Sequence, residues 1–145
     1  MTEYLLKASS IWFIGFFPFA EIYAAIAAGF AMKLDPVSIV VWSVTGNYVP
    51  AVGLAVGYDR LKHNPRVNRW IQKLVSEKAK RRMERYGVWG TLLLTPWIGV
   101  WAVAVTVKFF GMDTRQFLVT SFISILVYAM VITFGVHAGI SFLGK

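Results

Sequence analysis

Residues 16–35 read FFPFAEIYAAIAAGFAMKLD, and residues 94–113 read LTPWIGVWAVAVTVKFFGMD. Each stretch places a proline 17 residues before an aspartate, and the two patterns lie 78 positions apart (Pro18 with Asp35, Pro96 with Asp113). A second apolar run follows each aspartate, and Ser43 matches Ser121 at the same offset. Paired, interrupted apolar segments in corresponding halves of a chain are typical of secondary transporters, which place a binding site near the middle of the membrane. A chance similarity between two apolar halves is the alternative.

The composition is that of a membrane protein. The 145 residues are 57% hydrophobic, with a mean hydropathy of +0.60, which is too apolar for a soluble domain of this size. Four stretches are long enough to cross roughly 30 Å of hydrocarbon as helices: 8–32, 36–58, 87–107 and 117–143. We therefore expect an all-α, multi-pass protein of the plasma membrane that forms one membrane domain over residues 1–145. The chain has no cysteine, which excludes thiol chemistry, disulfides and cysteine-ligated metal.

The net charge of +8 is concentrated in residues 59–86, which contain ten Lys and Arg residues and only three acidic residues. A nucleic-acid site is one interpretation of such a cluster. A basic loop between two membrane segments is more simply the positive-inside signal, so we expect this loop to be cytoplasmic and no nucleic acid to bind.

The same loop carries the pattern of an amphipathic helix. Asn64 suits the cap position, Pro65 suits the first helical position, and Gly87 suits the end. We expect Trp70 and Ile71 to face the membrane while basic residues contact lipid headgroups. These basic residues are Arg66, Arg69, Lys73, Lys80 and Arg81.

Two topologies fit the charge distribution equally. If the proline-containing segments cross fully, both termini are cytoplasmic. If they are re-entrant, both termini lie outside. Twelve Lys and Arg residues lie inside and three outside in either case. Freed backbone groups beside an intramembrane proline need protein or water around them, which favours re-entrant segments and an inverted repeat of residues 8–58 and 87–143. A simple proline kink in a continuous helix is the alternative.

Glu21 is the only charged side chain within the four apolar stretches. A carboxylate there is costly, and such groups usually face a bundle interior or a water path, where Glu21 could bind and release a proton. Capping of a helix N-terminus is the structural alternative. Asn47 and Pro50 interrupt the second stretch, and Asn47 either lines a site or bonds a neighbouring helix. The sequence indicates no metal site, no cofactor and no enzyme motif.

Small residues four apart occur in the second stretch of each half: Gly53 with Gly57, and Gly135 with Gly139. Close helix packing, within one chain or between chains, is the natural interpretation.

Several short motifs resemble the putative small multi-drug export protein family, whose layout is similar to that of the DedA-like membrane proteins. They are AEIYAAI at residues 20–26, GNYVP at 46–50, RYG at 85–87, TPWIGVW at 95–101 and GMD at 111–113. The resemblance implies an integral membrane protein with two re-entrant segments and a transport role. It also implies site residues by position: Glu21, Asn47, Pro50, Pro96, Gly99 and Trp101. The chain departs from the family at Tyr23, where an Arg is usual, and at Ile98-Gly99, where a second Pro-Gly pair is usual.

Two functions follow from these patterns. The first is a small transporter, exporter or lipid-headgroup translocator with a polar site between the two broken segments, including Pro18 and Pro96. The second is a non-catalytic accessory subunit of a larger membrane complex. The expected partners are membrane lipids, with a second copy or other membrane subunits as further possibilities. An antiparallel dual-topology exporter conflicts with the charge bias.

Overall fold

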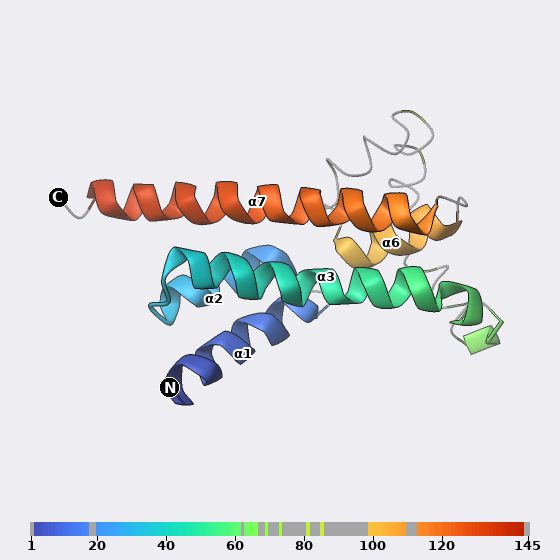
Figure 1. Ribbon diagram of the computed structural model, residues 1–145, viewed down its shortest axis with the longest axis horizontal. Coiled ribbons are helices and arrows are strands. Elements are labelled where there is room, and N and C mark those ends of the chain that lie inside the picture. The colour runs from blue at the N-terminus through green and yellow to red at the C-terminus, as the bar shows by residue number, and fades with distance from the viewer. Residues whose placement is uncertain are drawn as a thin grey trace. The chain divides into compact units, whose positions relative to one another are not determined.

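The computed structural model describes residues 2–17, 20–61, 63–66, 69, 73, 81, 85, 99–109 and 113–143. Within these residues the regular structure is helical throughout, as the sequence predicts. The helices, shown in Figure 1, are α1 (Thr2–Phe16), α2 (Glu21–Ala31), α3 (Pro36–Leu61), α6 (Val100–Phe109) and α7 (Thr114–Leu143). Two of them are long and apolar enough to cross a membrane, α3 over Pro36–Tyr58 and α7 over Thr114–Phe142.

The chain divides into two compact units. Unit 1 comprises Met1–Asn47 with Ile125–Lys145, and unit 2 comprises Tyr48–Ser124. Unit 1 therefore contains the first part of α3 and the last part of α7, while unit 2 contains the remainder of both helices. The expectation of a single membrane domain over residues 1–145 stays a prediction.

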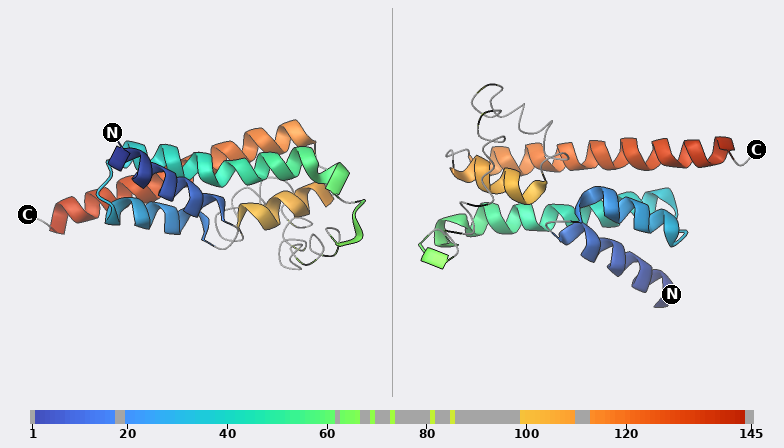
Figure 2. Two further views of the ribbon diagram at one scale, coloured as in Figure 1. Left: turned by 90° about the horizontal axis from the view of Figure 1, so that it is seen from below. Right: turned by 180° about the vertical axis from the view of Figure 1, so that it is seen from behind.

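Residues 8–32 form two helices rather than one. Helix α1 ends at Phe16, a turn follows in which Ala20 N–H donates to the Phe17 carbonyl (3.3 Å), and α2 begins at Glu21. Pro18 lies outside the described residues, but a proline here removes a backbone donor and clashes with the preceding turn. The chain reverses direction at this break, as the two further views agree (Figure 2), and α1 packs against α2. Residues 2–31 are thus a helical hairpin, not a kinked continuous helix.

Two glycines allow α1 to approach α3 closely. A Cβ atom at Gly46 would lie 2.2 Å from the Trp12 carbonyl oxygen, and one at Gly15 would lie 3.1 Å from the Ser43 carbonyl oxygen. Both neighbouring atoms belong to backbone, which cannot move aside as a flexible side chain can. The hairpin therefore packs against the first part of α3 through backbone surfaces that only glycine permits.

The 78-residue offset is also seen in local structure. Helices α2 and α6 end 78 positions apart, and α3 and α7 begin 78 positions apart. Asp35 accepts a hydrogen bond from the Ser38 N–H (2.9 Å), and Asp113 accepts one from the Gln116 N–H (3.0 Å). Each aspartate thus caps the helix that follows it. Hydrogen bonds from the Ser38 hydroxyl and N–H hold the pKa of Asp35 below its usual value.

The matched serines also behave alike. Ser43 and Ser121 are fully buried, and each hydroxyl donates to the carbonyl four residues earlier in its own helix, that of Ile39 and that of Phe117. The capped starts of α3 and α7 and the serine contacts within them therefore match at the 78-residue offset.

The turn between α2 and α3 holds a lysine in the left-handed region. Lys33 has φ 57°, while Leu34 N–H donates to the Gly29 carbonyl (3.1 Å) and Lys33 N–H to the Phe30 carbonyl (3.0 Å). This is the Schellman pattern, in which glycine normally occupies the left-handed position. The sequence places Gly111 at the position 78 residues after Lys33.

We predict that Lys33→Gly stabilises the protein. Glycine avoids a left-handed penalty of roughly 1–2 kcal/mol, of which its greater freedom in the unfolded chain offsets part, leaving up to about 1 kcal/mol. The melting temperature in detergent should rise. Lys33→Ala removes the same charge but keeps the Cβ atom, so an equal rise in that variant would contradict the conformational explanation.

Candidate functional site at the break between α1 and α2

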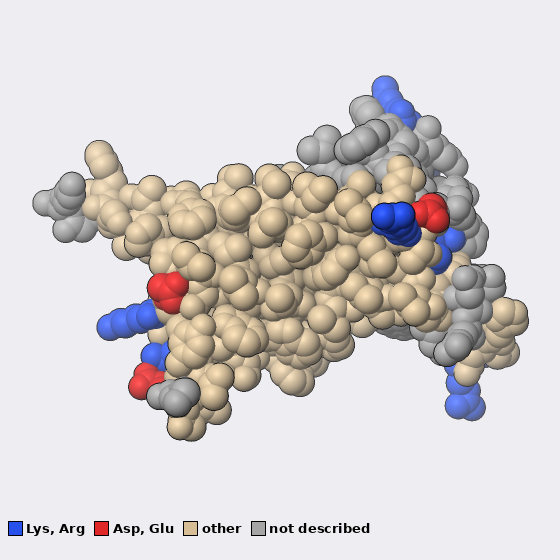
Figure 3. Space-filling view, viewed as in Figure 1, with Lys and Arg blue, Asp and Glu red and all other residues tan. Residues whose placement is uncertain are grey.

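The break between α1 and α2 lies beside the middle of α3. The start of α1 and the turn before α3 lie at the same end of unit 1 (Figure 1), where its described charged side chains gather (Figure 3). There Trp42 Nε1–H donates to the Tyr4 hydroxyl (3.1 Å), which also bonds the Ser38 hydroxyl (3.0 Å). Asn47 contacts the end of α1. It lies about 16 Å from the start of α3 at Pro36, at 1.5 Å per residue. This is roughly half the thickness of a 30 Å hydrocarbon core.

Asn47 connects α3 to the end of α1. Its side chain is only 5% exposed, and its amide Nδ2 donates to the Gly15 carbonyl (3.1 Å). The last carbonyl groups of a helix have no partner within that helix, so Asn47 satisfies one that the break leaves open. Of the two alternatives for Asn47, the bond to a neighbouring helix is the one observed, and its role in transport stays a prediction.

Pro50 adds a further interruption at this depth. It is buried inside α3, and the helix continues past it. Since proline has no N–H, it cannot donate the hydrogen bond that the Gly46 carbonyl would otherwise receive. Gly46 is also the residue that contacts Trp12 of α1. Polar backbone groups of α1 and α3 therefore concentrate beside the break.

Glu21 is the first residue of α2. The residue before it, Ala20, provides no side-chain hydrogen bond to the start of the helix. The first N–H groups of a helix carry partial positive charge and stabilise a nearby carboxylate. The backbone position of Glu21 suits both a capping role and a transport role, and both stay open.

The sequence analysis did not predict an aromatic cluster at the end of α1, directly before the break. Trp12 stacks on Phe16 with ring centroids 5.5 Å apart, and Phe13 lies 6.4 Å from Phe17. Phe13 and Phe17, with Ile14 and Ala20, line an open apolar hollow of about 380 Å³. The spacing of three and four between aromatic residues immediately before Pro18 was a signal that could have indicated this cluster.

The second broken segment is described only from Gly99 onward, so Pro96 lies outside the described residues. Gly99 has φ 89°, and its carbonyl accepts the first hydrogen bond of α6, from Val103 N–H (3.1 Å). This left-handed conformation explains a glycine directly before a helix. Trp101 is half-buried in the first turn of α6. Gly99 and Trp101 belong to unit 2, whereas Glu21 and Asn47 belong to unit 1.

Three of the four predicted packing glycines have no close neighbour among the described residues. A Cβ atom at Gly53, Gly135 or Gly139 would meet no described atom within 4 Å, and Gly57 is half-buried. The role of these glycines in helix packing stays a prediction. The contact that is now predicted is one with a helix of a second molecule. The close approach within the chain uses Gly15 and Gly46 instead.

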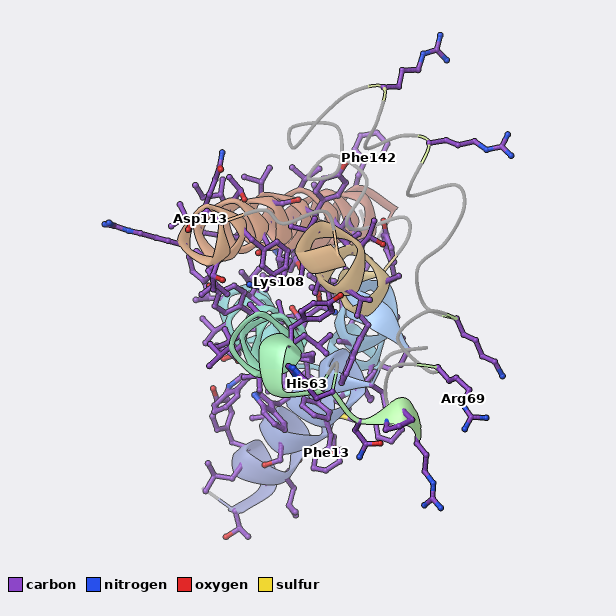
Figure 4. The ribbon with its side chains drawn as sticks, turned by 90° about the vertical axis from the view of Figure 1, so that its right-hand side faces the viewer. Phe13, His63, Arg69, Lys108, Asp113 and Phe142 are labelled. Carbon is purple, nitrogen blue, oxygen red and sulfur yellow. The ribbon has the colours of Figure 1, made fainter. Side chains whose placement is uncertain are left out.

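In the basic loop the predicted helix start is present. Pro65 is helical, and the Asn64 Oδ1 accepts a hydrogen bond from the Arg66 N–H (3.0 Å), as a cap does. Arg66, Arg69, Lys73 and Arg81 are all exposed, and Figure 4 shows the Arg69 side chain extending outward. Trp70, Ile71 and Lys80 lie outside the described residues.

We predict that Asn47→Leu destabilises the protein by about 1–2 kcal/mol, because the Gly15 carbonyl loses its donor while staying buried. The melting temperature in detergent measures the loss. Thr45→Leu is the matched control, since Thr45 is an exposed polar residue on the same helix. Equal losses of stability in the two variants would show that the hydrogen bond from Asn47 to Gly15 does not contribute to stability.

Comparison with known proteins gives one finding. A family model described as a putative small multi-drug export protein matches residues 21–132, from the first residue of α2 into α7. No curated protein and no solved structure matches the chain.

Proposed function

Because this chain belongs to the putative small multi-drug export protein family, we propose that it is a membrane transporter that exports small organic molecules through a site at the break between α1 and α2. The observation that carries the proposal is the α1–α2 hairpin, whose break lies about halfway along α3. Family membership and the two long apolar helices make it a membrane protein. The plasma membrane, a multi-pass topology and a cytoplasmic loop at residues 59–86 are part of the proposal.

In this proposal the hairpin is re-entrant. At 15 and 11 residues, α1 and α2 are about 22 and 16 Å long, and neither reaches across about 30 Å of hydrocarbon. Both outer ends of the hairpin lie at the charged end of unit 1. The hairpin then enters and leaves from one membrane face, while α3 crosses to the other. The repeated α6–α7 motif enters from the opposite face as the second half of an inverted repeat, and each unit combines opposite ends of α3 and α7, as antiparallel spans would.

The transport site would use the polar groups that the breaks expose. Helix ends within the membrane present N–H and carbonyl groups that need water or a ligand. Asn47 fixes the end of α1, and Glu21 at the start of α2 supplies a carboxylate able to exchange a proton with a passing substrate. Basic residues of the loop, Arg66, Arg69, Lys73, Lys80 and Arg81, would contact lipid headgroups. The protein works without a catalytic step.

The test of transport is flux across vesicles that contain the purified chain. A panel of neutral, anionic and cationic dyes should include at least one that crosses faster than in vesicles without protein. Equal rates for every dye would overturn the exporter proposal.

The re-entrant topology predicts opposite labelling of two single cysteines introduced into this cysteine-free chain. A cysteine at Lys33 should react with a membrane-impermeant reagent from outside, and a cysteine at Arg115 only after the membrane is opened. Both positions are exposed, Lys33 in the turn before α3 and Arg115 in the first turn of α7. Labelling of both from outside would instead support four plain spans.

A second candidate is an accessory subunit of a larger membrane complex. The favouring observation is the open surface of α7, of which only 28% of the apolar window is buried, with Gly135 and Gly139 available for close contact. Purification in mild detergent distinguishes the two functions. Recovery in a stable, stoichiometric complex with unrelated subunits would favour the accessory role.

A further inference from the structure

Asn47 has one polar atom that the contact between α1 and α3 does not use. The residue is only 5% exposed, and its Nδ2 donates to the Gly15 carbonyl (3.1 Å). In the described part of the chain, the Asn47 Oδ1 accepts no hydrogen bond. Because a buried acceptor without a donor is costly, this oxygen indicates a ligand beside the end of α1.

Two backbone carbonyls near the break also lose their helical donors. Pro50 has no N–H to donate to the Gly46 carbonyl. On α1, the Phe17 N–H donates to the Ile14 carbonyl (3.3 Å). It therefore does not serve the Phe13 carbonyl, which would be its partner in a continuing α-helix. Both helices thus present acceptor oxygens at the same level of unit 1.

The acceptor groups of α3 lie against the end of α1. A Cβ atom at Gly15 would lie 3.3 Å from the Asn47 N and 3.6 Å from the Gly46 carbonyl carbon. Helices α1 and α3 begin at the same end of unit 1 (Figure 1), so their carbonyl groups point the same way, and the end of α1 carries partial negative charge. Residues 8–32 and 34–58 contain no Lys, Arg or His. No basic side chain of these helices therefore offsets that charge.

Neutral oxygen ligands suit a monovalent cation, whereas calcium and magnesium sites use carboxylates. Backbone carbonyls and helix C-termini are the ligands with which membrane proteins coordinate Na⁺ and K⁺. We propose that the Asn47 Oδ1, the Gly46 carbonyl and the carbonyls of the last turn of α1 bind a monovalent alkali cation, which ties the end of α1 to α3. The proposal stands on this helix contact and does not depend on the transport function.

The test is the melting temperature of the purified chain in detergent, measured in NaCl, KCl and choline chloride at equal ionic strength. A ligand that binds only the folded protein stabilises it in proportion to the logarithm of its concentration above the dissociation constant. Na⁺ or K⁺ should therefore raise the melting temperature. Choline, which is too large to enter the contact between two helices, should not. The alkali ion that acts at the lower concentration is the ligand.

Pro50→Ala should weaken the cation affinity by roughly 10- to 100-fold, because it restores an N–H donor to the Gly46 carbonyl. Alanine suits a helix, so this variant should fold. Asn47→Leu removes the Oδ1 and should weaken the affinity by a similar factor. Thr45→Leu is the matched control, because Thr45 is an exposed polar residue on the same helix. It should leave the affinity unchanged.

Equal melting temperatures in the three salts would overturn the proposal and leave water as the partner of these oxygens. An alkali-ion effect of unchanged affinity in folded Pro50→Ala and Asn47→Leu variants would also overturn it, because the ion would then bind elsewhere. Dye flux is not measured in this experiment, so the exporter proposal stands or falls separately.

Discussion

Gly46→Ala is expected to destabilise the protein by about 3 kcal/mol, the upper end of the usual cost of adding a methyl group to a packed contact. The added Cβ atom would lie 2.2 Å from the Trp12 carbonyl oxygen. That oxygen belongs to the backbone of α1, so relief requires the whole helix to shift away from α3. Such a shift would also lengthen the Asn47–Gly15 hydrogen bond. The melting temperature in detergent and the folded yield should both fall.

Gly53→Ala is the matched control for this result. Gly53 lies on the same helix, two turns further along, and a Cβ atom there would meet no described atom within 4 Å. Alanine is intrinsically better in a helix by up to about 1 kcal/mol, so this variant should be as stable as the parent or more stable. A stable Gly46→Ala variant would mean that α1 does not approach α3 as closely as the structure describes.

Local sequence signals indicated where the breaks between the helices lie. The proline at position 18 and the aspartates at 35 and 113 act through their own backbone and the next few residues. The predicted stretches 36–58 and 117–143 lie within α3 and α7, and α1 ends two residues before Pro18. The offset of 78 could be seen in the sequence for the same reason, because a proline and an aspartate recur at the same spacing in both halves.

Contacts between helices could not be predicted in the same way. Spacing alone singled out Gly53 and Gly135, but whether a glycine packs closely depends on which helix faces it, and Gly15 and Gly46 carry the close contact. The partner of Asn47 was likewise open until the hairpin placed Gly15 beside it. The left-handed Lys33 had no local signal beyond the glycine at the matching position 111.

Glu21→Gln is expected to abolish flux while leaving the fold intact. The amide keeps the shape and the hydrogen-bonding capacity of the side chain, but it cannot ionise, so it cannot exchange a proton. Flux through vesicles and the detergent melting temperature should be measured on the same preparation. Glu3→Gln is the matched control, since Glu3 is an exposed carboxylate paired with Lys7 (2.6 Å) at the outer end of α1, and this change should affect neither quantity.

Glu21→Leu separates transport from capping. If Glu21 only satisfies the first N–H groups of α2, which Ala20 leaves without a side-chain cap, glutamine should be tolerated because its oxygen still accepts hydrogen bonds. Leucine should then cost about 1–3 kcal/mol by leaving those groups unpaired. Full flux in Glu21→Gln together with lost stability in Glu21→Leu would remove Glu21 from the mechanism. Lost flux in Glu21→Gln at an unchanged melting temperature would place the ionised carboxylate in it, because the two side chains differ in charge and hardly in shape.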